Sequence, residues 1–336
     1  MTMRTFKTVV LFLLIATSAA AQHRRRAVGS PFPAGPCSPG IVASAPGITD
    51  FVVSSGQVFW GDFDGNIWRA PREGAITPTS VARAPGTQIL WIDADATKVY
   101  FATFGEGVTA DFYSVPRAGG TPALITSNIL TPGAITSDDQ FIYWASLGTP
   151  AGEDFLADGS VGRVAKTGGA VQTLANNLSF PFCITVSGGN VYYGETGIAV
   201  GNTSAGVRRV PAGGGAVVKL FDGAPVGDIA IDATSMYFTV FRLGTGLVDV
   251  EKMPVGGGNA TPLVPSLDFA AGLVLQGSSL YYIADIGESE SLYAVSVAGG
   301  TPRVIREGEA ATSRIAFDEC LTYSTNVDEA IVRSFR

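Results

Sequence analysis

The stretch Val58 to Gly74, "VFWGDFDGNIWRAPREG", joins two short apolar segments through an acidic turn, and its first triplet recurs along the chain. Six relatives follow "VFW": "VYF" at 99–101, "IYW" at 142–144, "VYY" at 191–193, "MYF" at 236–238, "LYY" at 280–282 and "LTY" at 321–323. Successive copies are separated by 41 to 49 residues. A repeat of this length, built from several short strands, is typical of a β-propeller.

Each repeat contains the same four apolar segments. A segment such as "DIAIDAT" leads into the aromatic strand, a loop follows, and a third strand such as "FYSVPRA" ends at paired glycines before a fourth strand such as "TPALIT". Adjacent glycines supply the positive backbone angles of a tight hairpin. Helical periodicity is absent, and β-branched and aromatic residues fill the strands. We therefore predict an all-β, seven-bladed propeller of four-stranded antiparallel blades, with the aromatic triplets packed between neighbouring blades; a six-bladed ring is the alternative.

The two ends of the repeat array complement each other. The seventh repeat, "RIAFDECLTYSTNVDEAIVRSFR", stops after its third strand, whereas "CSPGIVASAPG" at 37–47 aligns with the fourth strands of other copies. An N-terminal strand that completes the last blade would remove the open edge of the ring. This predicts one propeller domain at residues 37–336.

The residues before the domain resemble an export signal. Arg4 and Lys7 precede the apolar run "VVLFLLIA", and "TSAAA" follows with a cleavage site after Ala21. We therefore expect a signal peptide at 1–21, a flexible lead-in at 22–36 and a secreted protein, periplasmic or extracellular. The formal net charge of −7 becomes −9 without Arg4 and Lys7. This acidity argues against nucleic acid as a partner, and the short apolar run argues against membrane insertion.

"VFWGDFDGNIWRAPREG" resembles the repeat of the YWTD propellers of low-density-lipoprotein receptors, and the whole chain is similar to secreted bacterial TolB-like propellers. Only the first copy is close to the YWTD pattern, through Trp60, Asp62, Ile67 and Arg69. The acidic position is Glu195 in the fourth copy, and the other copies carry non-acidic residues there. YWTD propellers have six blades where this chain has seven repeats, so the resemblance implies a fold and no specific activity.

Histidine is almost absent from the chain. Its single copy, His23, lies in the lead-in, so the domain contains neither a Ser-His-Asp or Cys-His arrangement nor a histidine-ligated metal site. We assign no catalytic residues and no cofactor. Calcium bound by carboxylates remains open.

Asp62, Asp64 and Asn66 form the acidic turn of the first repeat and are the weak metal candidates. An EF-hand loop requires glycine at its sixth position, where this chain has Ile67, and it requires flanking helices. Asp, Asn and Gly also suit a hairpin turn. We therefore interpret "DFDGN" as a turn.

Three cysteines are consistent with an oxidising compartment. Cys37 begins the fourth strand of the closing blade and Cys320 ends its first strand, so both belong to the same rim. We predict a Cys37–Cys320 disulfide and a buried, unpaired Cys183; three buried thiols are the alternative.

The loops between the second and third strands are long in repeats two to five and short in repeats one and seven. Insertions on one face of a repeat fold often bind a partner. The binding candidates that gather in these loops are Glu106, Asp111, Glu153, Asp154, Asp158, Glu195, Arg242, Asp249 and Asp285. Ordinary solvated charge is the alternative for each of them.

Three functions remain open at this stage. The first is a non-catalytic propeller, expected to be a monomer, that presents the long loops to a protein or glycan; the acidic excess favours a basic or calcium-bridged partner. The second is a calcium-dependent hydrolase or lactonase, and the third is a structural module of an envelope assembly.

Overall fold

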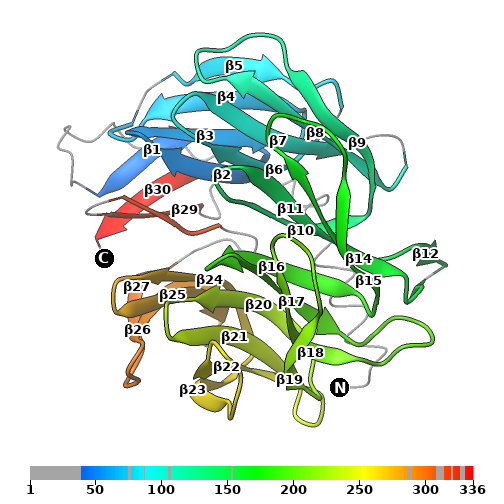
Figure 1. Ribbon diagram of the computed structural model, residues 1–336. Coiled ribbons are helices and arrows are strands. Elements are labelled where there is room, and N and C mark those ends of the chain that lie inside the picture. The colour runs from blue at the N-terminus through cyan, green and yellow to red at the C-terminus, as the bar shows by residue number, and fades with distance from the viewer. Residues whose placement is uncertain are drawn as a thin grey trace.

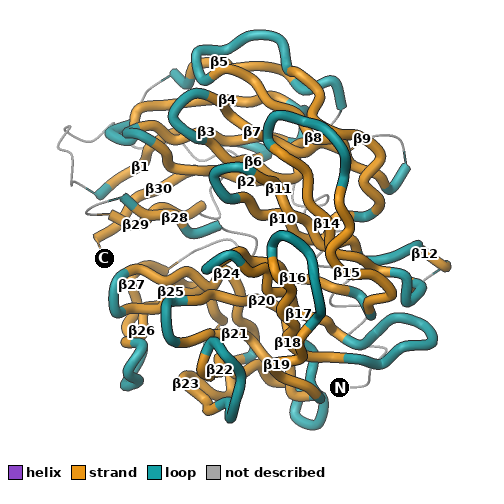
Figure 2. The backbone as a smooth tube through the Cα atoms, in the orientation of Figure 1, coloured by secondary structure: helices purple, strands orange, loops and turns teal. Residues whose placement is uncertain are grey.

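The computed structural model describes residues 39–74, 77–86, 88–104, 107–152, 154–285, 290–307, 314–318, 321–325 and 330–335. Strands and the loops between them make up all of the described chain, in which no helix is present (Figure 2). None of it forms a helix long and apolar enough to cross a membrane. The signal peptide, the lead-in, Cys37 and Cys320 lie outside the described residues.

Six four-stranded antiparallel sheets are contiguous in sequence (Figure 1). The first three are β2 (Ile48–Ser54), β3 (Gln57–Asp62), β4 (Asn66–Pro71) and β5 (Thr79–Arg83); β6 (Ile89–Ala94), β7 (Lys98–Phe104), β8 (Thr109–Pro116) and β9 (Ala123–Leu130); and β10 (Pro132–Ser137), β11 (Phe141–Ser146), β14 (Gly159–Ala165) and β15 (Gln172–Leu178). The next three are β16 (Pro181–Ser187), β17 (Asn190–Thr196), β18 (Ala205–Pro211) and β19 (Val218–Asp222); β20 (Val226–Ile231), β21 (Ser235–Arg242), β22 (Leu247–Pro254) and β23 (Thr261–Leu267); and β24 (Phe269–Gln276), β25 (Ser279–Asp285), β26 (Glu290–Ser296) and β27 (Arg303–Glu307).

A further four-stranded sheet combines the two ends of the chain. Its order is β1 (Gly40–Ser44), β30 (Ala330–Phe335), β29 (Leu321–Thr325) and β28 (Ala316–Phe317). β1 pairs antiparallel with β30, so the N-terminal strand takes the place that the seventh repeat leaves empty. In the described residues, six blades are each formed from one continuous stretch of sequence, which is the blade number of the six-bladed alternative. A seventh four-stranded sheet is complete only because the N-terminal strand β1 joins the C-terminal strands.

Paired glycines form the turns between third and fourth strands. Gly119, Gly168, Gly257 and Gly299 have φ of 103°, 84°, 99° and 96°, and each is followed by a second glycine with positive φ. L-residues with a Cβ rarely adopt this region. In the fourth repeat the sequence has three successive glycines, and the two with positive φ are Gly214 and Gly215 rather than the first pair, Gly213 and Gly214, that the repeat pattern predicts.

Aromatic side chains fill the spaces between blades, as predicted. One cluster joins Tyr143 of the third blade to Tyr193 of the fourth, and another joins Tyr192 of the fourth to Phe238 of the fifth. Tyr143, Tyr193 and Phe238 are among the largest fully buried side chains. The core is thus divided into layers, each shared by two neighbouring sheets.

Basic side chains add polar ties between neighbouring blades. Arg69 in β4 donates to the carbonyl of Arg117 in the next blade, at 3.0 Å, and Lys252 in β22 donates to the carbonyl of Val297, at 2.7 Å. Arg333 in β30 donates to the carbonyls of Arg72 and Glu73 and so ties the closing blade to the first.

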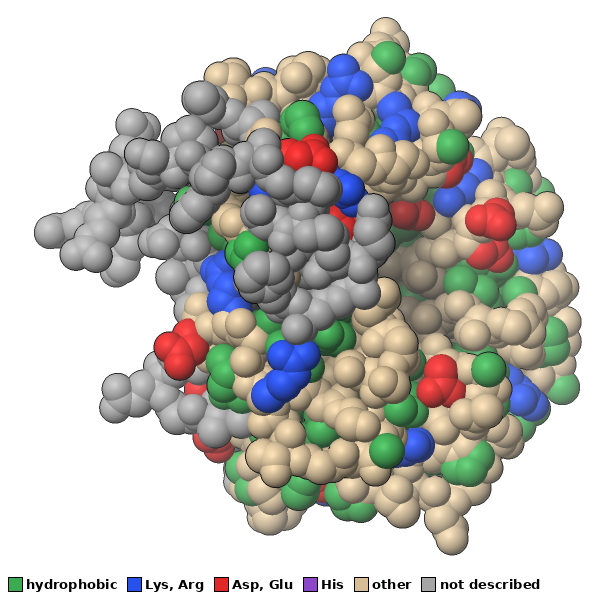
Figure 3. All heavy atoms as spheres, turned by 90° about the vertical axis from the view of Figure 1, so that its left-hand side faces the viewer, with side chains coloured by type: hydrophobic (Ala, Val, Ile, Leu, Met, Phe, Trp, Pro, Cys, Tyr) green, Lys and Arg blue, Asp and Glu red, His purple; other side chains and the backbone are tan. Residues whose placement is uncertain are grey.

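Antiparallel strand order gives the ring two different faces. Loops from second to third strands and from fourth to first strands share one face, called here the loop face; the other two kinds of connection share the turn face. In Figure 1 the β12 hairpin marks the loop face at the right, and the C-terminal end of β30 marks the turn face at the left. Figure 3 therefore views the turn face, whose surface is hollowed near its middle.

Candidate interaction surface

The loop face carries the connections from second to third strands, and those of blades three and four are long, joining β11 to β14 and β17 to β18. The long loops predicted for repeats two and five are wrong, because most of those residues extend the strands: β7 ends at Phe104 and β8 begins at Thr109, and only residues 243–246 separate β21 from β22. The longest of them folds into its own hairpin of β12 (Pro150–Ala151) and β13 (Asp154–Phe155), which extends from the ring (Figure 1). The fold therefore places the variable loops of adjacent blades on one side.

Apolar contacts hold the two longest loops in place. Phe155 lies edge-on to Phe180, with ring centroids 4.8 Å apart, and Phe180 stacks on Phe182 at 6.2 Å. The same cluster contains Leu147 and Ile198, one from each loop. Leu156 and Val200 then join the loops through a parallel β-bridge. The loops of blades three and four thus form one packed platform.

In each of blades two to five, the connection from the second to the third strand exposes one large apolar side chain. Val108, Leu156, Val200 and Leu243 retain 45%, 41%, 51% and 44% of their accessible surface. They come from blades two, three, four and five, which are successive around the ring. We call these four residues the apolar arc. Single exposed apolar residues are common on proteins, whereas exposed apolar residues that lie together mark interaction sites, and the β-bridge places Leu156 and Val200 together.

Asp111 and Asp249 occupy equivalent positions in third strands and serve the backbone. Asp111 accepts the amide of Asn128, at 2.9 Å, and Asp249 accepts the amide of Ser266, at 2.8 Å. Both donor amides belong to residues with φ near 60° in the adjoining fourth strand. These carboxylates therefore stabilise an irregular strand pairing.

Asp158 closes the base of the longest loop. Its two oxygens accept the amide and the hydroxyl of Thr149, at 2.7 and 2.6 Å. These hydrogen bonds are the main cause of the lowered pKa of Asp158. Asp154 lies in β13 and is half-buried.

Glu195 and Arg208 form a buried pair inside the fourth blade. Arg208 Nε lies 3.2 Å from Glu195 Oε1, and the same guanidinium reaches Asp222 at 2.6 Å. Glu195 also accepts the amide of Ser179. Burial raises the pKa of Glu195, and Arg208 and the Ser179 amide oppose that shift. The acidic residue of the fourth repeat is therefore an internal tie and is not available to a partner.

Arg242 is held between two carboxylates of the neighbouring strand. Its Nε donates to Asp249 at 2.7 Å, and its terminal nitrogen pairs with the buried Glu251. The hydrogen bond to Asp249 is the main cause of the raised pKa of Arg242. Asp285 lies opposite Glu290 in the strand register, and burial, followed by the charge of Asp285, raises the pKa of Glu290. Glu106 and Glu153 lie outside the described residues.

The acidic turn of the first repeat is a hairpin turn. Asp62 accepts the amides of Asp64 and Asn66, at 3.0 and 2.8 Å, and the indole N–H of Trp68, at 2.9 Å. The Asn66 side-chain amide donates to Asp62 as well. Both oxygens of Asp62 are thus used within the turn. In the described part of the chain, no three His, Cys, Asp or Glu side chains lie close enough to hold a metal ion.

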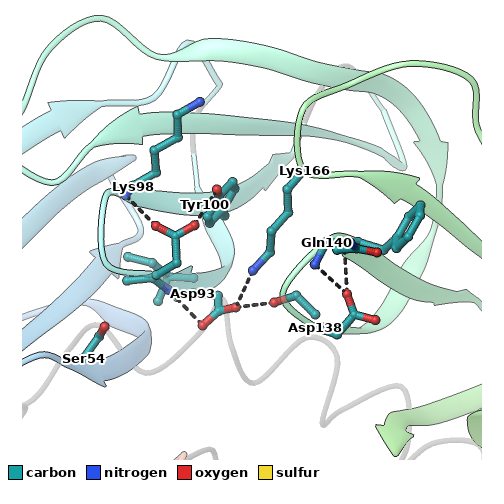
Figure 4. A network of polar contacts seen from close by, with 12 residues as sticks. Ser54, Asp93, Lys98, Tyr100, Asp138, Gln140 and Lys166 are labelled. Carbon is teal, nitrogen blue, oxygen red and sulfur yellow. Dashed lines mark hydrogen bonds and ion pairs between the residues drawn. The ribbon is translucent and has the colours of Figure 1, made fainter. Parts of the chain in front are cut away.

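A polar network on the turn face is the strongest competing site (Figure 4). Lys166, nearly buried, lies 3.5 Å from Asp93 and 4.5 Å from the centroid of the Tyr100 ring, and Ser137 donates its hydroxyl to Asp93. Serine, lysine and aspartate together resemble the parts of a nucleophilic site.

Comparison with the equivalent position in the second blade shows the role of the Lys166 network. One blade earlier, Arg117 lies 4.5 Å from the Phe59 ring and donates to Ser54 at 2.9 Å. In both cases a cation after the third strand reaches back to the first strand and aromatic ring of the preceding blade. The network of Lys166 is therefore one copy of a tie between blades.

Cys183 is a free, buried thiol on β16, as predicted. Burial, with the nearby charge of Asp228, raises its pKa well above the usual value. The thiol is consequently protonated and unreactive. The predicted partners Cys37 and Cys320 lie outside the described residues, so their bond stays a prediction.

The sequence analysis named charged side chains in these connections, and most of those that the structure describes make local contacts. The large side chains left exposed there are apolar. The signal was present: each of these connections places an apolar residue among polar neighbours, as in "EGVTAD", "FLADG", "AVGNT" and "RLGTG".

Comparisons with known proteins identify the fold and nothing finer. No protein-family model and no curated protein match the chain. Among solved structures, the WD40 beta propeller domain of Doa1 is 13% identical with a TM-score of 0.60, and the match covers 89% of this chain and 97% of that one. The computationally designed Ika8 protein is also 13% identical, with a TM-score of 0.54 and coverage of 88% and 97%.

The tricorn protease matches with a TM-score of 0.66 and 13% identity over 92% of this chain. This chain spans only 36% of the protease chain. Together with the sheet topology, these similarities show a β-propeller repeat protein. They do not distinguish a TolB-like or a YWTD-type propeller.

Proposed function

We propose that this chain is a secreted, non-catalytic binding propeller that presents its loop face to a protein or glycan partner. The observation that carries the proposal is the apolar arc, four exposed side chains on successive blades, supported by a packed base. Substitutions in these loops can change partner binding without destabilising the ring, because the loops lie outside the apolar layers between the blades.

The export signal and the absence of histidine from the domain support the other two parts of the proposal. The export signal predicted at residues 1–21 would direct the protein out of the cytoplasm. Without histidine, catalysis would depend on carboxylates, lysine or an oxygen-ligated metal. Asp158, Asp249 and Glu195 at the loop face serve local contacts, as do Lys166 and Asp93 on the turn face.

The test compares two fourfold variants of the mature protein. The first changes Val108, Leu156, Val200 and Leu243 to serine. The matched control changes four equally exposed residues on outer strands or their turns, Leu124, Val171, Val217 and Val304, to serine. Point substitutions test the surface more specifically than deletion of the loop at 149–159, because the deletion would remove Phe155 and expose the Phe180 ring on which it packs.

Each variant is used to capture partners from the secreted fraction of its own source. We expect both variants to fold and only the first to lose the partner. Equal capture by the two variants would contradict the proposal. Lactonase or esterase turnover that requires calcium would favour the enzyme, and retention in an envelope complex by both variants would favour the structural module.

A further inference from the structure

Three phenylalanine rings join the loop-face ends of successive blades. Phe155 belongs to the hairpin of blade three, Phe182 to β16 of blade four and Phe241 to β21 of blade five. All three are partly buried, and all three pack against the one buried cluster that contains Leu147 and Phe180. Because they share this base, the three rings form one surface across blades three to five, called here the aromatic platform.

Leu156 and Val200 extend the aromatic platform outward. The parallel β-bridge places these two exposed side chains together, and the amide of Val200 donates to the carbonyl of Phe155 at 2.9 Å. The connection that carries Val200 is also held from below, because the Ser179 hydroxyl donates to the carbonyl of Asn202. A partner therefore meets apolar side chains that are already ordered, which lowers the entropic cost of association.

Negative charge flanks the platform on two sides. On the blade-five side, Arg242 follows Phe241 and pairs with two carboxylates, Asp249 and Glu251. On the blade-three side, Asp158 is exposed and accepts hydrogen bonds from the uncharged Thr149; it pairs with no lysine or arginine of the described chain. These hydrogen bonds lower the pKa of Asp158, so its carboxylate is charged at neutral pH.

Blade four, between these two sides, adds no excess of positive charge. Its Glu195 and Asp222 face Arg208 and Lys219, with the lysine 3.9 Å from Asp222. The platform is therefore apolar at its centre and negative at its flanks. Interfaces pair opposite potentials, so this distribution selects against an anionic partner and favours one that carries cations beside an apolar group.

We infer that the aromatic platform binds a polypeptide segment in which an aromatic or aliphatic anchor is flanked by lysine or arginine. The inference rests on the proposed function and specifies the chemistry of the partner. The anchor is buried against the phenylalanine rings, and the flanking cations lie near Asp158 and near the carboxylates that share Arg242. Burial of the anchor supplies affinity that salt does not screen, whereas the flanking charges supply selection and a salt-dependent part of the affinity.

The experiment titrates the mature protein into four labelled synthetic peptides of equal length. Three of them share a Leu-Phe-Leu centre, which is flanked by lysines in the first, by serines in the second and by glutamates in the third. The fourth keeps the lysines and has a serine centre. Binding is measured by fluorescence anisotropy at about 0.05 and about 0.5 M NaCl, because added salt screens exposed charges. We expect the wild type to bind the first peptide most tightly.

One pair of variants tests the apolar contribution. Leu156→Ser with Val200→Ser removes the two exposed side chains of the bridge. The control, Val171→Ser with Val217→Ser, changes comparably exposed residues on the turn face of the same two blades. The first variant should bind the lysine-flanked apolar peptide at least about tenfold more weakly at both salt concentrations. The control should bind it like the wild type.

A second pair of variants tests the charge. Asp158→Asn removes one negative charge and keeps an oxygen that can accept the amide of Thr149, whereas the control, Asp139→Asn, removes an exposed charge from the turn face. Asp158→Asn should weaken binding of the lysine-flanked apolar peptide about twofold to fivefold at low salt and less at high salt. Asp139→Asn should leave it unchanged.

Equal or tighter binding of the serine-flanked or glutamate-flanked peptide would overturn the inference. Equal binding of the lysine peptide without the apolar centre, or no binding of any peptide, would overturn it as well. The proposed function has its own test in the capture of partners from the secreted fraction. If the apolar-arc variant loses that partner, only the partner's chemistry is wrong; if it keeps the partner, both proposals fail.

Discussion

Tyr193 and Tyr282 each bury a phenol hydroxyl that has no hydrogen-bond partner among the described residues. They occupy the last aromatic position of their repeats, where two other repeats carry Phe101 and Phe238. An unpartnered buried hydroxyl costs about 1–3 kcal/mol, so the ring is needed at this position and the hydroxyl is not.

We therefore expect Tyr193→Phe and Tyr282→Phe to leave the unfolding temperature unchanged or to raise it. The control is Tyr143→Phe. Tyr143 is also fully buried, but its hydroxyl donates to Asp138 at 2.7 Å, so its loss should lower the unfolding temperature. The measurement is thermal unfolding followed by circular dichroism. A clear loss of stability in the first two variants would show that their hydroxyls have partners.

Asp62 and Glu195 show which roles of a single residue can be predicted from the sequence and which cannot. The turn at Asp62 was predicted because Asp, Asn and Gly within five residues form a local pattern. Glu195 was placed in the binding surface because its partner Arg208 lies on the facing strand, and only the strand register brings the two together. Burial of a charge depends on a distant residue, which a local pattern does not contain.

At the scale of the element, three turns between first and second strands use the same device. Asp95, Asp138 and Asp232 each accept two backbone amides of their own turn and the hydroxyl of a tyrosine five residues later. Burial opposes ionisation of these carboxyls, but the hydrogen bonds outweigh it and lower the pKa of each one. The same contact and burial raise the pKa of Tyr143 to about 12.

These turns predict a loss of stability in acid. A carboxyl whose pKa is lower in the folded state contributes stability above its unfolded pKa of about 3.9, and that contribution disappears as the pH falls below it. The triple variant Asp95→Asn, Asp138→Asn and Asp232→Asn should be less stable at pH 7, by roughly 1 kcal/mol per site. Its unfolding temperature should also fall less than that of the wild type between pH 5 and pH 3.

The control is Asp139→Asn, an exposed carboxylate beside Asp138 in the same turn. It should leave both the unfolding temperature at pH 7 and its acid dependence close to those of the wild type. If the triple variant showed the full acid dependence of the wild type, these three carboxyls would not be its source.

Some strands could be predicted from the sequence and others could not, and the difference has a physical cause. The strands of each blade follow from alternating apolar residues and from glycines that must adopt positive φ, both of which are local signals. The hairpin of β12 and β13 was not predicted. Its strands are two residues long, and tertiary contacts of Phe155 with Phe180 hold it in place.

At the scale of the whole molecule, ring closure depends on β1. Val42 and Ala43 in this strand are buried, and β30 would become an open edge without it. Deletion of residues 1–47 should therefore cost several kcal/mol, which is a large fraction of a typical stability. Deletion of residues 1–36, which keeps β1, should change little. Equal unfolding temperatures for the two truncated chains would contradict closure by β1.

The cysteines give a second test of closure. A Cys37–Cys320 bond would link the two ends of the ring and, in the chain-entropy model, contribute about 5–6 kcal/mol less any strain. Titration of the denatured, unreduced mature protein should find one thiol, that of Cys183. Three thiols would exclude the bond, and closure would then depend on strand pairing alone.

The central claim is that the loop face of blades two to five is the surface that meets a partner. Site-specific photo-crosslinking tests it most directly: a benzophenone amino acid replaces Val200 in one protein and Val217 in another, each is mixed with the secreted fraction of its own source, and the sample is irradiated. Val200 belongs to the apolar arc, and Val217 is a comparably exposed residue on the turn face. The account predicts a discrete covalent adduct from position 200 and none from position 217. The same adduct from position 217 with none from position 200, or no adduct from position 200 at all, would contradict it.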